Sequence, residues 1–249
     1  MESESNRLEF GKMKNNFLTT EFFHTYNRGV EKRNTFLDEK DYFRGVHDLY
    51  EFNDANATLN LNYHLNYWSR SAIDLGEKKK KGVRDLLIDL FAWTFIPNHY
   101  HNFLRGRVER GISKFQQKWG GGYTNYFNLK YKRSGVLFQG KYKKISVTND
   151  AQAAHLVCYI HSNPLDIWKP NWKEKGLSPS ETQNALKFLE KYRWSSHMDY
   201  WGVKNFPSLI NTEFLFKFFG GPEGYRKFFI DWLKQYDKNI KFIQKFTLE

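Results

Sequence analysis

Apolar and polar residues follow two periods along the first half of the chain, and the order of these periods predicts the fold. Glu21 to Arg28 has the β-branched and aromatic content of a strand, whereas Asp38 to Phe52 spaces its apolar residues at helical intervals. Leu86 to Phe95 and His99 to Arg105 again have the pattern of strands, and the Pro97–Asn98 turn between them favours an antiparallel pair. The first half therefore has the order strand, helix, strand, strand.

The second half continues with a helix, a strand and a helix. Gly111 to Leu129 predicts a helix interrupted at its three consecutive glycines, 120–122, and Gly135 to Val147 predicts a fourth strand. A last helix begins at Asn149 or Asp150, either of which can cap it, and Pro164 ends it. We therefore expect an α+β fold with a ferredoxin-like βαββαβ antiparallel sheet, helices on one face, and the last helix laid across the sheet.

The remainder of the chain predicts a helical C-terminal extension. Beyond Trp168 there are two weaker helical stretches, Ser180 to Tyr192 and Tyr225 to Tyr236, and Gly220 to Gly224 between them is expected to be a loop. The expected organisation is an N-terminal arm at residues 1–20, a main domain at 21–170 and the extension at 171–249.

Composition narrows the class of protein. The 249 residues carry 39 Lys and Arg against 27 Asp and Glu, a formal net charge of +12, and aromatic residues make up 18% of the chain, which disfavours disorder. Cys158 is the only cysteine, so an internal disulfide framework and a cysteine-rich zinc module are excluded. The basic surplus predicts an acidic partner, with nucleic acid favoured over an anionic membrane surface.

The sequence favours a soluble, cytoplasmic protein without a membrane partner. Its N-terminus lacks the basic and apolar regions of a signal peptide, and the apolar run Leu86 to Ile96 is shorter than the roughly 20 residues of a membrane-spanning helix. Residues 53–82 end in a basic run, Lys78 to Lys81, which is expected to be a solvated loop or, as the alternative, a contact with a phosphate backbone.

Two groups of residues are candidates for chemistry. His99 and His101 are two apart in a predicted strand, so both imidazoles leave the same face of the sheet, although such a pair alone is also compatible with packed or exposed histidines. In the last helix, His155, Tyr159 and Asn163 are spaced by four and share one helix face. Packing in the core and at the helix end remain alternatives for Tyr159 and Asn163.

Together these residue types suit the activation of a phosphodiester. A divalent cation held by two imidazoles and a carboxamide oxygen keeps positions open for a phosphate oxygen. Tyr159 would be the nucleophile. Because a tyrosine has a pKa near 10, the cation must both polarise the phosphate and favour loss of the phenolic proton.

Six segments at these positions resemble one family. They are TYNRG (25–29), IPNHYHNFL (96–104), GISKFQQKWGGGYTNYFN (111–128), RSGVLFQGKYK (133–143), YIHSNP (159–164) and RWSS (193–196). They occur in the order seen in REP-associated tyrosine transposases, which belong to the HUH single-tyrosine superfamily of IS200-like transposases, and the resemblance covers about residues 20–200. It implies that 21–170 is the catalytic domain, that His99, His101 and Asn163 bind the metal, and that Tyr159 is the nucleophile.

The resemblance also implies a reaction. Such enzymes use Mg²⁺ or Mn²⁺ to cleave single-stranded DNA beside a hairpin, leaving a 5′-phosphotyrosine and a free 3′-OH, and they can reverse the step to join strands. The residues in or beside the family motifs that are candidates for phosphate contacts are Arg28, Arg133, Lys141, Lys143 and Lys144. Tyr123, Tyr126 and Phe127 are candidates for base stacking, although core packing is favoured for them. His155 could orient the phenol or lie on the helix surface.

Two other functions stay open at this point. One is a domesticated protein that binds hairpin DNA without catalysis, and the other is a hydrolytic metallonuclease in which water attacks and Tyr159 only packs. The sequence also leaves open whether the chain acts as a monomer or a homodimer. It does not decide whether the C-terminal extension packs on the domain, binds the hairpin or mediates assembly.

Overall fold

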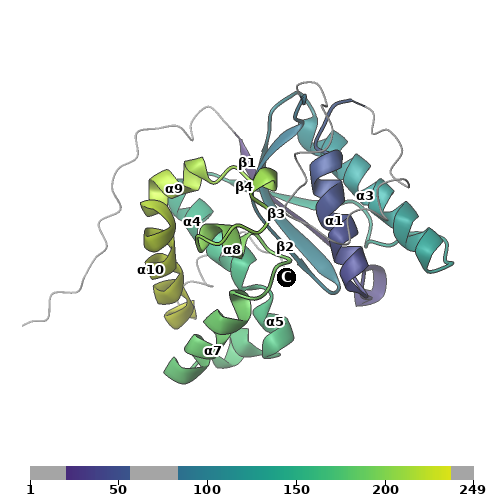
Figure 1. Ribbon diagram of the computed structural model, residues 1–249. Coiled ribbons are helices and arrows are strands. Elements are labelled where there is room, and N and C mark those ends of the chain that lie inside the picture. The colour runs from purple at the N-terminus through teal and green to yellow at the C-terminus, as the bar shows by residue number, and fades with distance from the viewer. Residues whose placement is uncertain (1–20, 57–83, 237–249) are drawn as a thin grey trace, which may run out of the picture.

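The computed structural model of the chain describes residues 21–56 and 84–236 (Figure 1). The predictions for the N-terminal arm, for Lys78 to Lys81 and for the tail after Tyr236 lie outside these residues. The strands are β1 (Phe22–Arg28), β2 (Ile88–Ile96), β3 (His99–Gly106) and β4 (Lys143–Val147). The helices are η2 (Val30–Lys32), α1 (Glu39–Glu51), α3 (Gly111–Lys130), α4 (Asp150–Ser162), α5 (Leu165–Trp168), α6 (Trp172–Lys175), α7 (Pro179–Leu189), α8 (His197–Tyr200), η3 (Pro207–Leu209), α9 (Glu213–Phe219) and α10 (Gly221–Lys234).

The four strands form one antiparallel sheet in the order β2-β3-β1-β4. This is the strand order of a ferredoxin-like βαββαβ fold, so the α+β prediction is confirmed, including the helical region that follows it. The β2–β3 hairpin turns at Pro97 and Asn98, as the sequence predicted. Because β1 lies between β3 and β4, residues of all three strands meet in transverse rows on each face of the sheet.

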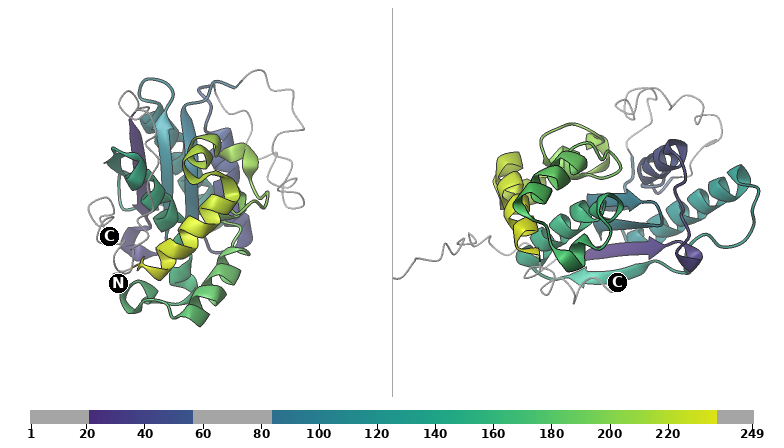
Figure 2. Two further views of the ribbon diagram at one scale, coloured as in Figure 1. Left: turned by 90° about the vertical axis from the view of Figure 1, so that its left-hand side faces the viewer. Right: turned by 90° about the horizontal axis from the view of Figure 1, so that it is seen from below.

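Side chains leave β1 alternately toward two separate hydrophobic clusters. Phe23 packs in a cluster with α1 and α3, and Phe22 packs in the other with α4 and the C-terminal helices. The two helices α1 and α3 thus cover one face, and α4 crosses the opposite face with α9 and α10 outside it (Figure 2). The sheet is therefore buried on both sides.

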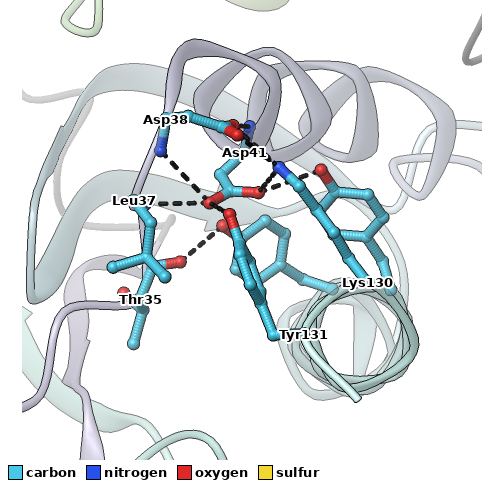
Figure 3. Close-up of polar contacts among 8 residues, drawn as sticks. Thr35, Leu37, Asp38, Asp41, Lys130 and Tyr131 are labelled. Carbon is cyan, nitrogen blue, oxygen red and sulfur yellow. Dashed lines mark hydrogen bonds and ion pairs between the residues drawn. The ribbon is translucent and has the colours of Figure 1, made fainter. Parts of the chain in front are cut away.

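A polar network holds α1 against α3 (Figure 3). Asp38 and Asp41 form a capping box at the start of α1, and the wholly buried Asp41 carboxylate also accepts a hydrogen bond from the backbone N–H of Leu37 at 2.8 Å. From the end of α3, Lys130 donates to Asp41 at 2.7 Å and the Tyr131 hydroxyl donates to it at 2.7 Å. One carboxylate therefore fixes the beginning of one helix to the end of the other.

The glycines 120–122 do not interrupt α3, so that detail of the sequence prediction is wrong. Trp119 and Tyr123 are completely buried and one turn apart, and their packing holds the helix continuous through the glycines. A Cβ on Gly122 would collide with the ring of Phe52 at the end of α1. Here glycine permits a close approach between helices and does not end one.

The fourth strand is shorter than predicted. Only Lys143–Val147 pairs with β1, whereas residues 135–142 form a loop in which Gly135 and Gly140 both have positive φ. A β-bridge between Gly29 and Phe138 and a hydrogen bond from Asn27 Nδ2 to the Gly140 carbonyl tie this loop to the end of β1. The left-handed backbone at the two glycines is incompatible with a continuous strand.

The C-terminal prediction also needs one correction. Gly220 ends α9 in a left-handed conformation, but the segment that follows it is the first turn of α10 and not a loop. Pro222 lies in that first turn, where a missing N–H costs nothing. None of the described helices is long and apolar enough to cross a membrane. The division at residue 170 stays a prediction, although the C-terminal helices share a hydrophobic cluster with α4.

Candidate active site

The two predicted histidines lie on the α4 face of the sheet, in register with β1. His99 pairs with Arg28, and His101 pairs with Tyr26, whose other neighbour is Lys143 of β4. Directly opposed residues of antiparallel strands point to the same face. Arg28, Tyr26 and Lys143 therefore lie on the same face as the histidine pair.

Helix α4 places Tyr159 over this row. The helix begins where the Asn149 side chain accepts a hydrogen bond from the backbone N–H of Gln152 at 2.9 Å, as predicted for a cap. It packs across β2 and β3, so its central turns are buried. Tyr159 is 1% exposed and lies in the last turns of the helix, close to the histidine strand.

The rings of His99, His101 and Tyr159 converge. The ring centroids of the two histidines are 4.9 Å apart, and those of His101 and Tyr159 are 5.5 Å apart with an edge-to-face orientation. Both histidines are buried. Two elements that are about 60 residues apart in the sequence thus bring the predicted nucleophile and the predicted imidazole ligands into one cluster.

A third histidine, His24 of β1, belongs to the same cluster, and the sequence reasoning missed it. Its Nε2 lies 2.9 Å from Nδ1 of His101, and its ring centroid is 6.2 Å from that of Tyr159. The signal that could have found it is the spacing of two. His24, Tyr26 and Arg28 lie on one face of their strand, just as His99 and His101 do on theirs.

Asn163 ends α4 beside the cluster, and its amide is engaged on both sides. Its Nδ2 donates to the backbone oxygen of Tyr159 at 2.9 Å, and its Oδ1 accepts from Nζ of Lys173 at 3.3 Å. Lys173 also donates to Asp166 at 2.8 Å and lies 5.4 Å from the centroid of the Tyr159 ring. A lysine of α6, absent from the sequence prediction, is therefore the cation next to the predicted nucleophile.

Hydrogen bonding indicates which nitrogen of His99 carries a proton. Its Nδ1 lies 2.6 Å from Oδ1 of Asn98, which can only accept, so Nδ1 donates, and in the neutral ring Nε2 then carries the lone pair. A neutral imidazole in this tautomer suits metal ligation. Among the residues described, no three or more His, Cys, Asp and Glu side chains form a group that could hold a metal ion.

The predicted phosphate contacts are divided between the faces. Arg28 and the exposed Lys143 lie on the histidine face, whereas Lys144 lies on the other face, its Nζ 4.1 Å from the ring centroid of Phe23. Arg133 donates to Asn128 Oδ1 and to the Val136 carbonyl and so holds the loop after α3. Lys141 is exposed in that loop.

The aromatic residues considered for stacking are buried or half-buried in the α1–α3 side of the protein. The hydroxyl of Tyr123 donates to the carbonyl of Thr35 at 2.6 Å, and that of Tyr126 donates to Asp41 at 2.9 Å. Phe127 is also buried in the α1–α3 cluster. His155 packs against α10, where its Nδ1 accepts from Nε1 of Trp232 at 3.0 Å.

A second group of buried histidines lies on the same side of the sheet, where α4 meets the C-terminal helices. The Tyr225 hydroxyl bonds Nδ1 of His161 at 2.6 Å and Nδ1 of His197 at 2.9 Å, and Nε2 of His161 bonds Ser196 Oγ at 2.7 Å. Burial lowers the pKa of His197 to about 3, and burial with the adjacent His197 lowers the pKa of His161 well below its usual value. Both imidazoles are therefore neutral at pH 7.

No protein-family model and no curated protein matches the chain. Among solved structures, the chain is similar to the structure of a REP-associated tyrosine transposase bound to a REP hairpin. The two share 11% sequence identity at a TM-score of 0.42, over 76% of this chain and 83% of that chain. A likeness at this level does not establish a shared family or a shared activity.

Proposed function

We propose that the chain is a metal-dependent HUH-type tyrosine transposase that cleaves and rejoins single-stranded or hairpin DNA. The observation that carries the proposal is the convergence of two distant elements: the ring centroid of Tyr159 lies 5.5 Å from that of His101, which lies 4.9 Å from that of His99. The net charge of +12 and the exposed Lys143 on the same face favour a polyanionic substrate. A cytoplasmic location is part of the same proposal.

In the proposed reaction, the phenolic oxygen of Tyr159 attacks the phosphorus of one phosphodiester. The new bond joins that oxygen to the 5′ side of the DNA, the bond from phosphorus to the 3′-oxygen breaks, and the leaving oxygen takes up one proton for the one that the phenol loses. No water is consumed, so the energy of the phosphodiester is kept and the reverse step joins strands. Without the phenolic oxygen the new bond cannot form, which makes Tyr159 the residue to test.

The residues fit a divalent cation through the two imidazoles, His99 and His101, and the amide oxygen of Asn163 is the third candidate. When bound there, the ion would polarise the phosphate and stabilise the charge that develops on it. Lys173 donates to Asn163 Oδ1, so the amide oxygen would serve as a ligand either through its second lone pair or after this contact is exchanged. Which ion, Mg²⁺ or Mn²⁺, is used belongs to the proposal.

The test is to trap the protein on DNA. Purified chain is incubated with Mn²⁺ and a hairpin oligonucleotide with single-stranded flanks, and the products are separated under denaturing conditions. We expect a covalent adduct whose peptide map places the nucleotide on Tyr159. Tyr159→Phe should form no adduct while binding the hairpin normally, and Tyr142→Phe is the matched control because Tyr142 is a half-buried tyrosine of the loop before β4.

The outcomes distinguish attack by Tyr159 from attack by water and from binding without catalysis. Cleavage that leaves a free 5′-phosphate and persists in Tyr159→Phe would mean that water attacks. Hairpin binding without cleavage in any metal would mean a non-catalytic binding protein. EDTA, His99→Ala and His101→Ala should each abolish the adduct, and an adduct that survives all three would show that the histidine pair is structural. If all of these expectations hold, the transposase proposal stands.

A further inference from the structure

The contact between His24 and His101 joins two completely buried imidazoles. Their Nε2 and Nδ1 atoms are 2.9 Å apart, and the rings stack with centroids 5.1 Å apart at an interplanar angle of 18°. The His24 ring also stacks with Tyr26, whose ring centroid is 5.0 Å away. His24 therefore has a fixed position and a short contact to the predicted metal ligand.

The two nitrogens share one hydrogen, and its position decides what His101 can do. If Nδ1 of His101 donates, its Nε2 keeps a lone pair and can bind a metal. If Nε2 of His24 donates instead, Nδ1 of His101 is the acceptor and its Nε2 carries the proton, so this imidazole cannot be a ligand. Protonation of both rings would place two donors against each other.

We propose that His24 is the acceptor and acts as a positioning residue, which holds His101 in the tautomer that can bind metal. Asn98 makes the corresponding contact to Nδ1 of His99, so both His99 and His101 would have the Nε2 lone pair for the metal. Ligating histidines commonly donate their second N–H to a fixed acceptor, and loss of that acceptor costs roughly 10–100-fold in metal affinity. This inference rests on the proposed function, in which His101 is a ligand.

The direct test is NMR of the histidine rings in the protein without metal and without DNA. Long-range nitrogen–proton correlations identify which ring nitrogen carries the hydrogen. We expect protonated Nδ1 and unprotonated Nε2 for His101, and the opposite arrangement would overturn the proposal. Because no DNA is present, this result does not depend on whether the chain forms an adduct.

The second measurement is Mn²⁺ affinity by calorimetry, with folding checked by thermal unfolding. His24→Leu removes the acceptor and should weaken binding about 10–100-fold. His24→Gln restores an acceptor oxygen at about the position of Nε2 and should recover most of the affinity. His155→Leu is the matched control, because His155 lies in the contact with α10.

The outcomes distinguish this proposal from the proposed function. Equal Mn²⁺ affinity in wild type and His24→Leu would overturn the role of His24 even if the adduct forms. Failure of wild type to bind Mn²⁺ would contradict the metal part of the proposed function, and the tautomer of His101 would still decide the present inference. If His24→Leu does not fold, the wild-type NMR result and His24→Gln decide it.

Discussion

The buried polar side chains of the strands are satisfied in different ways on the two faces of the sheet. On the α1–α3 face, the Tyr100 hydroxyl donates to Gln116 Oε1 at 3.0 Å and Gln116 Nε2 donates to Thr25 at 2.9 Å. These are hydroxyl and amide groups that do not titrate near neutral pH. On the α4 face the corresponding positions hold imidazoles, such as His24 and His101, whose donor and acceptor roles can be exchanged.

The two faces differ in whether their buried groups can change protonation. A group that keeps one protonation state near neutral pH can be buried against a single hydrogen-bond partner. Buried histidines are costlier to keep, since a change in protonation leaves a charge in the interior, and such groups concentrate at functional sites. We therefore expect substitutions on the α1–α3 face to change the free energy of unfolding directly, and those of the buried histidines on the α4 face to act through proton or metal equilibria.

The largest expected effect is on the α1–α3 face. Asp41→Ala removes a buried carboxylate that completes the capping box of α1 and accepts from Leu37, Lys130 and Tyr131, and it should lower the free energy of unfolding by about 2–4 kcal/mol. Urea unfolding measures this value. Glu213→Ala is the control, because its pair with Lys217 is exposed and should contribute little.

The same variant also tests the separation of the two faces. At temperatures where the Asp41→Ala variant is still folded, it should retain the ring-nitrogen signals of His101. Asp41 lies in α1, which covers the opposite face of the sheet. A changed tautomer in the folded variant would contradict the comparison. An unfolding free energy within about 0.5 kcal/mol of wild type, the range of ordinary surface substitutions, would contradict the role of the network.

The second expected effect is a pH dependence that arises on the α4 face. Burial lowers the pKa of His197 to about 3, so the unfolded chain takes up a proton on this histidine first as the pH falls. The contribution of His197 to the free energy of unfolding is therefore fully present above about pH 6.5 and is lost as the pH falls below it, by about 1.4 kcal/mol per pH unit. Urea unfolding at a series of pH values should show the slope.

A pair of variants isolates the contribution of His197. His197→Leu should be less sensitive to acid than wild type by about 1.4 kcal/mol per pH unit between the unfolded and folded pKa values. Tyr225→Phe loses the hydroxyl that bonds His161 and His197 but keeps both histidines, so it should retain the wild-type slope. Equal slopes in wild type and His197→Leu would mean that this imidazole does not titrate on unfolding.

The sequence predicts those secondary-structure elements and shared faces that depend on local periodicity. Spacing by two places His99 and His101 on one strand face, and helical spacing gives α4 with its cap. It cannot supply His24, because that contact depends on the register between β1 and β3, nor Lys173, which reaches Asn163 only after the chain reverses beyond Pro164. The catalytic, metal-binding and phosphate-binding roles remain predictions.

The wrong element boundaries arise because the sequence prediction gives local signals, such as glycines, too much weight. The glycines 120–122 are typical of a break, but the buried Trp119 and Tyr123 on either side of them keep α3 continuous, and Gly122 permits the close approach of Phe52. Gly135 and Gly140 fall within the predicted fourth strand, although their left-handed backbone prevents one. The same residue type thus ends one element and permits close packing in another, and only the tertiary contacts distinguish the two.

The smallest expected effect uses two adjacent lysines of β4 that point to opposite faces. Lys143 is in the row of Tyr26 and His101, whereas Lys144 lies over Phe23 on the α1–α3 side. If DNA lies along the α4 face, Lys143→Ala should weaken binding of single-stranded DNA severalfold. It should also make the slope of log affinity against log salt shallower by about 0.7, because one phosphate fewer is neutralised. Lys144→Ala removes the same charge one residue away and should change neither quantity.

Fluorescence anisotropy over a range of salt concentrations measures both the affinity and its salt dependence, and it is insensitive to catalysis when Tyr159→Phe is used as the common background. Equal losses of affinity in the two variants would mean that only net charge matters, and a loss confined to Lys144→Ala would place the DNA on the opposite face from Tyr159.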